Sequence, residues 1–319
     1  MLHLRLIVPR DVVDDVVQGL QANPGVAHVV RVPRASTSPP GELVLCDVVR
    51  EAGNQVVEWL QTLDVHRRGA IAVEAVEAVV SDAAASAAAG APGHGGDALV
   101  WEEVESRARD EATLTGSYLI FMVVAAAIAA IGVMLDSPVL IVGAMVVGPE
   151  YGPLAALCVA AVRRRRRPAV TAATTLAIGL AVATVGAVVA TALLRLTTIA
   201  PADYGVGERE LTAFISHPDG LSAVVAVLAG VVGMLALTEA RSGTLVGVLV
   251  SVTTIPAVGN VGVATAYGQW DEVVGASVQL AINLVGLVVA GIVTLAVQAR
   301  LTAAPLTPAA AAPSPGPAP

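Results

Sequence analysis

The pattern of apolar and polar positions divides the chain into two parts. Residues 1–81 contain short segments that alternate or repeat, whereas long apolar runs fill most of the chain after residue 115. Apolar residues at every second position predict strands, and apolar residues every three or four positions predict helices. By these rules the first part contains helices at 11–20 and 51–63 and strands at 2–9, 26–32, 42–49 and 70–80.

The order of these elements, β-α-β-β-α-β, predicts a cytoplasmic α+β domain of the ferredoxin-like type over residues 1–81. Ala and Gly then dominate residues 82–97, which predict a flexible linker because large apolar side chains are too few to form a core. Residues 98–115 are rich in Glu and Arg and predict a charged juxtamembrane helix. The Pro- and Ala-rich residues 301–319 predict a disordered tail.

Residues 116–300 read as an α-helical membrane domain. A hydrocarbon core of about 30 Å needs about 20 apolar residues in a helix, and six segments meet this requirement. They predict six transmembrane helices, at 117–135, 137–162, 168–194, 221–238, 242–268 and 273–299. Arginine is concentrated on the flanks that share a side with the N-terminal domain, and such arginine stays in the cytoplasm. We therefore expect a multi-pass protein of the bacterial cytoplasmic membrane with both termini cytoplasmic.

The six predicted helices form two three-helix halves, and the middle helix of each half carries helix-breaking residues. Pro149 lies at the centre of the second segment and Pro256 near the centre of the fifth. Proline removes a backbone donor and clashes with the preceding turn, so both helices are expected to break inside the membrane. Because each half crosses the membrane an odd number of times, an inverted repeat is one possible relation between the halves.

Half-helix ends near the bilayer centre carry backbone N–H and C=O groups without intrahelical partners, which favours an ion or small-solute site. Glu150 is the ionisable residue deep in a predicted span, where a charged acid costs roughly 2.5 to 3.5 kcal/mol. It either couples protons or coordinates a cation, or it lies in a loop that reaches water. The candidate site residues are Gly148, Pro149, Glu150, Tyr151, Gly152 and Pro153 on the second span and Ser251, Thr253, Thr254, Pro256 and Asn260 on the fifth.

A run of five arginines follows the second span. Such a run acts mainly as a topology signal and a contact for anionic lipid. The run consists of Arg163, Arg164, Arg165, Arg166 and Arg167.

Composition narrows the functional classes. Charged residues make up 14% of the chain, against about a quarter in soluble domains, which excludes a wholly soluble protein. A net charge of −8 without a basic domain argues against nucleic-acid binding. The two cysteines, Cys46 and Cys158, are too far apart for a CxxC metal site, and the histidines form no ligand pair. We therefore expect no cofactor, no metal and no enzymatic activity.

The run from Leu135 to Leu154, LDSPVLIVGAMVVGPEYGPL, resembles the signature of the bacterial and archaeal uncharacterised hydrophobic domain family, domain-of-unknown-function family 389. The stretch Thr254–Val258 is similar to that family's second motif, and the resemblance covers roughly residues 115–270. The chain departs from the family by carrying Glu150 and Tyr151 where the family is usually apolar, and one proline where the family has two. The resemblance supports the topology and implies no activity.

These observations favour a membrane transporter or channel-like permease for a small ion or solute, with a regulatory cytoplasmic domain. The alternative is a membrane-anchored sensor or scaffold whose soluble domain binds a small ligand or partner. Homo-oligomerisation is expected in either case, because Ala- and Gly-rich helix faces permit close contact and the predicted sheet exposes its edges.

Overall fold

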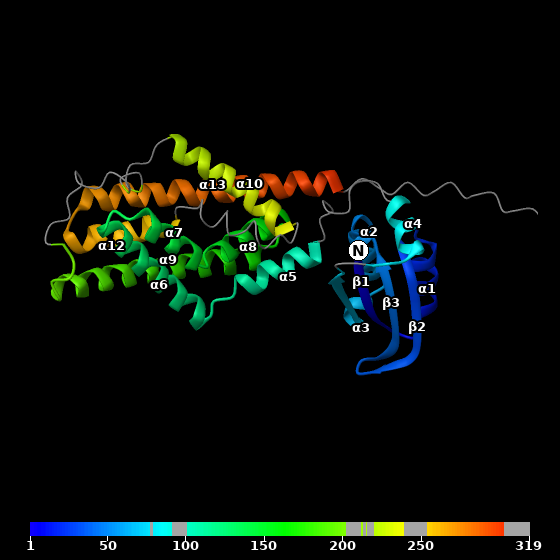
Figure 1. Cartoon of the computed structure of the whole chain (residues 1–319). Coiled ribbons are helices and arrows are strands. Elements are labelled where there is room, and N and C mark those ends of the chain that lie inside the picture. The colour runs from blue at the N-terminus through cyan, green and yellow to red at the C-terminus, as the bar shows by residue number, and fades with distance from the viewer. Residues whose placement is uncertain are drawn as a thin grey trace, which may run out of the picture. The chain divides into compact units, whose positions relative to one another are not determined.

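The computed structural model describes residues 1–76, 79–90, 101–201, 212, 215, 220–238 and 254–302 (Figure 1). They belong to two compact units, Met1–Glu103 with Gln298–Pro319, and Val104–Val297. Five predicted features lie partly outside the described residues: the fourth strand at 77–78, the second half of the linker at 91–97, the start of the juxtamembrane helix at 98–100, the first half of the fifth span at 242–253, and the tail from 303 onward.

The N-terminal unit contains a four-stranded antiparallel sheet with strand order β2-β3-β1-β4. Its elements follow the predicted order, with one short extra helix, α3, before the last strand. The bounds are β1 Leu2–Val8, α1 Val13–Ala22, β2 Val26–Thr37, β3 Pro40–Val48, α2 Arg50–Thr62, α3 Val65–Arg68 and β4 Ala70–Ala75.

The core of this unit follows from the alternation in β1. Leu2, Leu4, Leu6 and Val8 are fully buried, as expected for every second residue of a central strand with one covered face. The apolar stripes of α1 and α2 belong to the same core, with Leu20 and Leu60 among its largest buried side chains. The sequence pattern therefore specifies the core directly.

The prediction of a flexible linker is wrong for the first half of residues 82–97. Residues Asp82–Gly90 form helix α4, which lies against β2. Ala84 and Ala87 of α4 are buried, and Ala87 joins the core of the N-terminal unit. Alanine has the highest helix propensity, and its small side chain can pack closely on a strand. The shortage of large apolar residues was therefore not a sign of a flexible chain.

The second unit is a helical membrane region. Four of its helices are long and apolar enough to cross a membrane, and a bent pair, α7 with α8, makes a fifth candidate among the described residues. The bounds are α5 Trp101–Glu111, α6 Gly116–Met134, α7 Pro138–Val147, α8 Tyr151–Val162, α9 Arg166–Leu196, α10 Gly220–Thr238, α12 Thr254–Tyr267 and α13 Trp270–Thr302. Of the fifth predicted span, the described part is α12, which has 14 residues.

Helices at the centre of this unit pack closely where they carry Gly and Ala. A Cβ added to Gly259 of α12 would lie 2.6 Å from Cβ of Ala129 in α6, and one added to Gly262 would lie 2.4 Å from Cβ of Ala187 in α9. The backbone of α12 therefore lies close to the backbones of α6 and α9. Large apolar side chains such as Phe121, Val185 and Leu228 face outward, as expected for lipid-facing positions.

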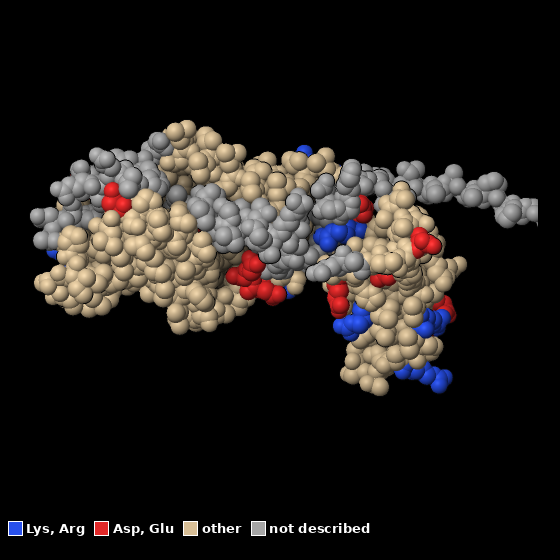
Figure 2. All heavy atoms as spheres, viewed as in Figure 1, with Lys and Arg blue, Asp and Glu red and all other residues tan. Residues whose placement is uncertain are grey.

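Charged side chains are few on the visible surface of the membrane helices. On the face seen in Figure 2, the visible acidic and basic groups lie mostly on the N-terminal unit and on α5, while the other membrane helices present mainly uncharged atoms. The buried acid Glu150 is an exception inside the helical region.

Candidate functional site

The second predicted span is divided at residues 148–150. α7 ends at Val147, and Gly148 leaves the helix with an extended backbone, φ −69° and ψ 127°. α8 begins at Tyr151, and the axes of the two helices differ by 54°. The interruption falls at the Gly-Pro-Glu run where the sequence predicts it.

Glu150 lies at this interruption and is buried, with 1% of its surface exposed. Its Oε1 accepts a hydrogen bond of 2.8 Å from the hydroxyl of Thr254. Its Oε2 is buried without a hydrogen-bond partner among the residues that the structure describes. Glu150 is therefore buried among the described residues instead of lying in a solvated loop, and its part in proton coupling or cation coordination stays a prediction.

One helix begins at this carboxyl group. Glu150 is the N-cap residue of α8, and its hydrogen-bond partner Thr254 lies in α12. The N-terminus of a helix carries a partial positive charge of roughly half an elementary charge. The start of α8 therefore favours a negative charge at position 150 over a neutral group.

The backbone at the interruption leaves little free space. A Cβ added to Gly148 would lie 2.4 Å from Oε2 of Glu150 and 2.7 Å from Cγ1 of Ile255. Glycine is therefore required where α7 approaches α12. Pro256 is buried in α12, two residues beyond Thr254. The residues that precede Thr254 lie outside the described part of the chain, so the predicted break of the fifth span stays a prediction.

Other predicted site residues have different neighbours. The hydroxyl of Tyr151 donates a hydrogen bond of 2.5 Å to the backbone oxygen of Gly233 in α10. Gly152 lies against the backbone of Glu111 in α5. Both residues connect α8 to neighbouring helices.

The remaining predicted site residues donate no hydrogen bond to the Glu150 carboxyl in the described part of the chain. Pro149 lies in the interruption, and Pro153 is buried in the first turn of α8. Asn260 is six residues beyond Thr254 along α12, a rise of about 9 Å. Ser251 and Thr253 lie outside the described residues. The structure therefore brings together Gly148, Glu150 and Thr254.

A second buried acid, Glu272, was missed because it lies just before the predicted sixth span. Glu272 is 5% exposed, and its Oε2 accepts a hydrogen bond of 3.3 Å from the amide of Asn260. α13 begins at Trp270, three residues before the predicted start, so the acid belongs to the first turn of the helix. Only residues 268–269 separate α12 from α13. A connection this short is the signal that could have indicated that Asn260 and Glu272 lie close together.

Polar side chains continue along α13. Gln279 and Asn283 are buried and share a hydrogen bond of 3.1 Å from Nε2 of Gln279 to Oδ1 of Asn283. Together with Glu272 they occupy positions i, i+7 and i+11, which lie on one face of a helix. In the described part of the chain, no group of three or more His, Cys, Asp and Glu side chains is arranged to hold a metal ion.

Residues 145–289 match the family described as "Domain of unknown function (DUF389)". The chain carries a DUF389 domain. This DUF389 domain begins within α7 and ends within α13, so it includes Glu150, Thr254 and Glu272. It begins later than the expected resemblance, after Asp136-Ser137-Pro138, and it extends further toward the C-terminus. No curated protein and no solved structure matches the chain.

Proposed function

We propose that this DUF389 protein is a transporter or channel-like permease for a small ion or solute. The observation that carries the proposal is the buried carboxyl of Glu150 at the interruption between α7 and α8, with Thr254 on one oxygen and no described partner on the other. A carboxylate in this position is expensive in a membrane unless it is protonated or faces a cation or water.

The interrupted backbone supports the same proposal. Peptide groups outside a helix are tolerated at membrane depth only where protein or a water-filled cavity satisfies them. Many transporters place such half-helix ends at the substrate or coupling-ion site. Glu150 would then exchange a proton or hold a cation while the interrupted helices form the path.

Further buried polar groups support a path through the helical region. Glu272, Gln279 and Asn283 share one buried face of α13, and Asn260 of α12 contacts the first of them. Ionisable side chains inside a membrane region face the bundle interior or a water-filled cavity and mark substrate or proton pathways, as Glu272 would here. We assign Glu150 and the α13 polar face to one conduction pathway, which would carry its cargo past two carboxyl groups.

The proposal extends to the whole chain. It includes six spans in two three-helix halves related as an inverted repeat, a broken fifth span, and a homo-oligomer in contact with membrane lipid. It places both termini in the cytoplasm of a bacterium and gives the N-terminal unit a ferredoxin-like fold, which its strand order β2-β3-β1-β4 supports. The N-terminal unit would regulate the pathway, and the protein would have no enzymatic activity and no cofactor.

The second candidate is a membrane-anchored sensor or scaffold. The observation in its favour is that the N-terminal unit has a core of its own, built from β1, β3, α1 and α2. In that case the helical region would serve as an anchor, and the buried acids would only join helices.

Flux measurement separates the two candidates. The full chain is reconstituted into liposomes and tested with protons, monovalent cations and a panel of small metabolites, with and without a pH gradient. The permease proposal predicts flux above that of empty vesicles for at least one species. If no species moves under either condition, the permease proposal is wrong and the anchored sensor is favoured.

A further inference from the structure

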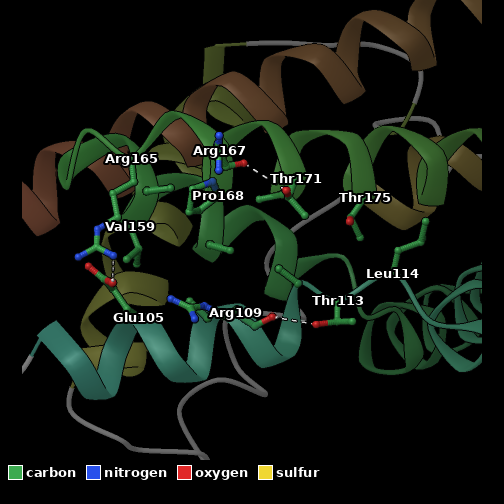
Figure 3. Close-up of a pocket in the computed structure, with 15 residues that line it drawn as sticks. Glu105, Arg109, Thr113, Leu114, Val159, Arg165, Arg167, Pro168, Thr171 and Thr175 are labelled. Carbon is green, nitrogen blue, oxygen red and sulfur yellow. Dashed lines mark hydrogen bonds and ion pairs between the residues drawn. The ribbon is translucent and has the colours of Figure 1, made fainter. Parts of the chain in front are cut away.

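The membrane unit contains a second feature that the pathway does not use, a pocket between α5, α8 and α9. The pocket has a volume of about 380 Å³, within the range of small-molecule sites (Figure 3). Its walls consist mostly of small apolar side chains, including Ala156, Val159 and Ala160 of α8 and Ala172 of α9. The interior of the pocket is therefore suited to a hydrocarbon group.

Arginine side chains line the same pocket from two sides. Figure 3 shows Arg109 on α5 and Arg165 and Arg167 at the start of α9. The acid that lines the pocket, Glu105, is already paired with Arg163 at 2.9 Å and with Arg165 at 3.3 Å. Arg109 and Arg167 form no ion pair with any acid in the described ranges. Among the described residues, the pocket therefore offers two positive charges that no acid balances.

The position of these charges along the chain identifies the kind of ligand. The arginines at 163–167 form the connection between the membrane helices α8 and α9 and the first residues of α9, so they lie at the end of two apolar segments. Lipid headgroups occupy this depth, and basic pockets between membrane helices bind anionic headgroups. A free anion would make no use of the apolar walls, whereas an acyl chain would bury apolar surface against them.

We propose that this pocket binds one anionic phospholipid of the surrounding membrane. The phosphate group lies between Arg109 and Arg167, and the beginning of an acyl chain lies along the alanine and valine side chains of α8. Phosphate accepts charge-assisted hydrogen bonds from arginine, which are about twice as strong as neutral ones. The Glu105–Arg165 pair holds α5 against the start of α9 and so forms one wall of the site. This inference does not depend on transport.

The test measures lipid binding to the full chain in detergent by native mass spectrometry. Phosphatidylglycerol is titrated into the wild type, into the double variant R109Q/R167Q and into the control R164Q/R166Q. The control removes the same number of charges from residues that do not line the pocket. We expect R109Q/R167Q to bind at least about tenfold more weakly and the control to stay within about twofold of the wild type. Equal losses in both double variants would overturn the proposal in favour of a general basic surface.

Two further arms identify the ligand as a lipid. Thr171 lines the pocket but is exposed, so T171F fills the space without disturbing the helix core. We expect T171F to weaken phosphatidylglycerol binding although every arginine remains. Phosphatidylcholine should bind more weakly than phosphatidylglycerol to the wild type, and inorganic phosphate should not displace the bound lipid. Displacement by inorganic phosphate, or unchanged binding to T171F, would overturn the proposal.

Discussion

The hydroxyl of Thr254 donates a hydrogen bond to Oε1 of Glu150 across 104 positions of the sequence. This bond joins α12 to the interruption between α7 and α8. Both residues are buried, at 0% and 1% exposure. The contact therefore connects the one buried acid of the predicted second span to the described part of the fifth.

Replacing Thr254 by valine should weaken this connection. Valine has nearly the same shape but no hydroxyl, so T254V leaves both carboxyl oxygens of Glu150 without the bond. The loss should lower the stability of the protein by about 1–3 kcal/mol, the range for a hydrogen bond to a buried charged or polar group. Thermal unfolding in detergent measures the change. T254S keeps the hydroxyl and should melt close to the wild type; equal melting of both variants would contradict the assigned contact.

Alanine at Gly148 should also disturb the interruption, through crowding. A Cβ there would lie 2.7 Å from Cγ1 of Ile255, closer than carbon atoms approach without displacement. Overpacking of this kind costs typically about 1–3 kcal/mol. Gly143 of α7 is the matched control, because a Cβ added there meets nothing within 4 Å. Thermal melting should therefore fall for G148A and stay the same or rise for G143A, and the reverse order would refute the close approach of α7 and α12.

In the N-terminal unit, a carboxylate should make stability depend on pH. Asp47 accepts hydrogen bonds from Nδ1 of His3 at 2.8 Å and from Nδ1 of His28 at 2.7 Å. Burial raises the pKa of Asp47, but the two imidazole bonds outweigh it and leave this pKa below its ordinary value. The folded pKa is thus lower than the unfolded pKa of about 3.9. Ionised Asp47 therefore stabilises the fold above about pH 4, and the stabilisation is lost as the pH falls through the folded pKa.

The variant D47N tests this dependence. At pH 7 the amides of β1 and β3 should exchange hydrogen faster in D47N than in the wild type, because the opening free energy is smaller. Below the folded pKa of Asp47 the difference should close. D15N, which removes an exposed acid of α1, is the control and should change these amides little at either pH. A difference between D47N and the wild type that stays constant with pH would show that the carboxylate charge contributes nothing.

The sequence predicted those structural features that depend on residues close together along the chain. The lengths of α6, α9 and α13 follow from apolar runs that a bilayer requires, and the interruption at Gly148–Glu150 follows from the local chemistry of Gly and Pro. Similarly, the strands and helices of the N-terminal unit follow from local periodicity. Each of these features is encoded within a few turns of the chain.

Contacts between distant residues could not be predicted in this way. Hydropathy assigns each segment a length but does not say which segment lies beside it, so Glu150 had no predicted partner. Glu272 was assigned to a flank because a boundary error of three residues separates a solvated acid from a buried one. α4 was missed because its contribution to the core depends on how closely alanine can approach β2, which composition does not reveal.

The most direct test of the central claim compares flux through E150Q and D271N in liposomes. Both variants remove one carboxylate from the helical region, but Asp271 is exposed, whereas Glu150 is buried at the interruption. With a species that the wild type moves, and with the pH varied on one side, E150Q should lose flux or its pH dependence while D271N keeps both. If E150Q and wild type move the species equally at every pH, Glu150 is not part of a pathway and the account is contradicted.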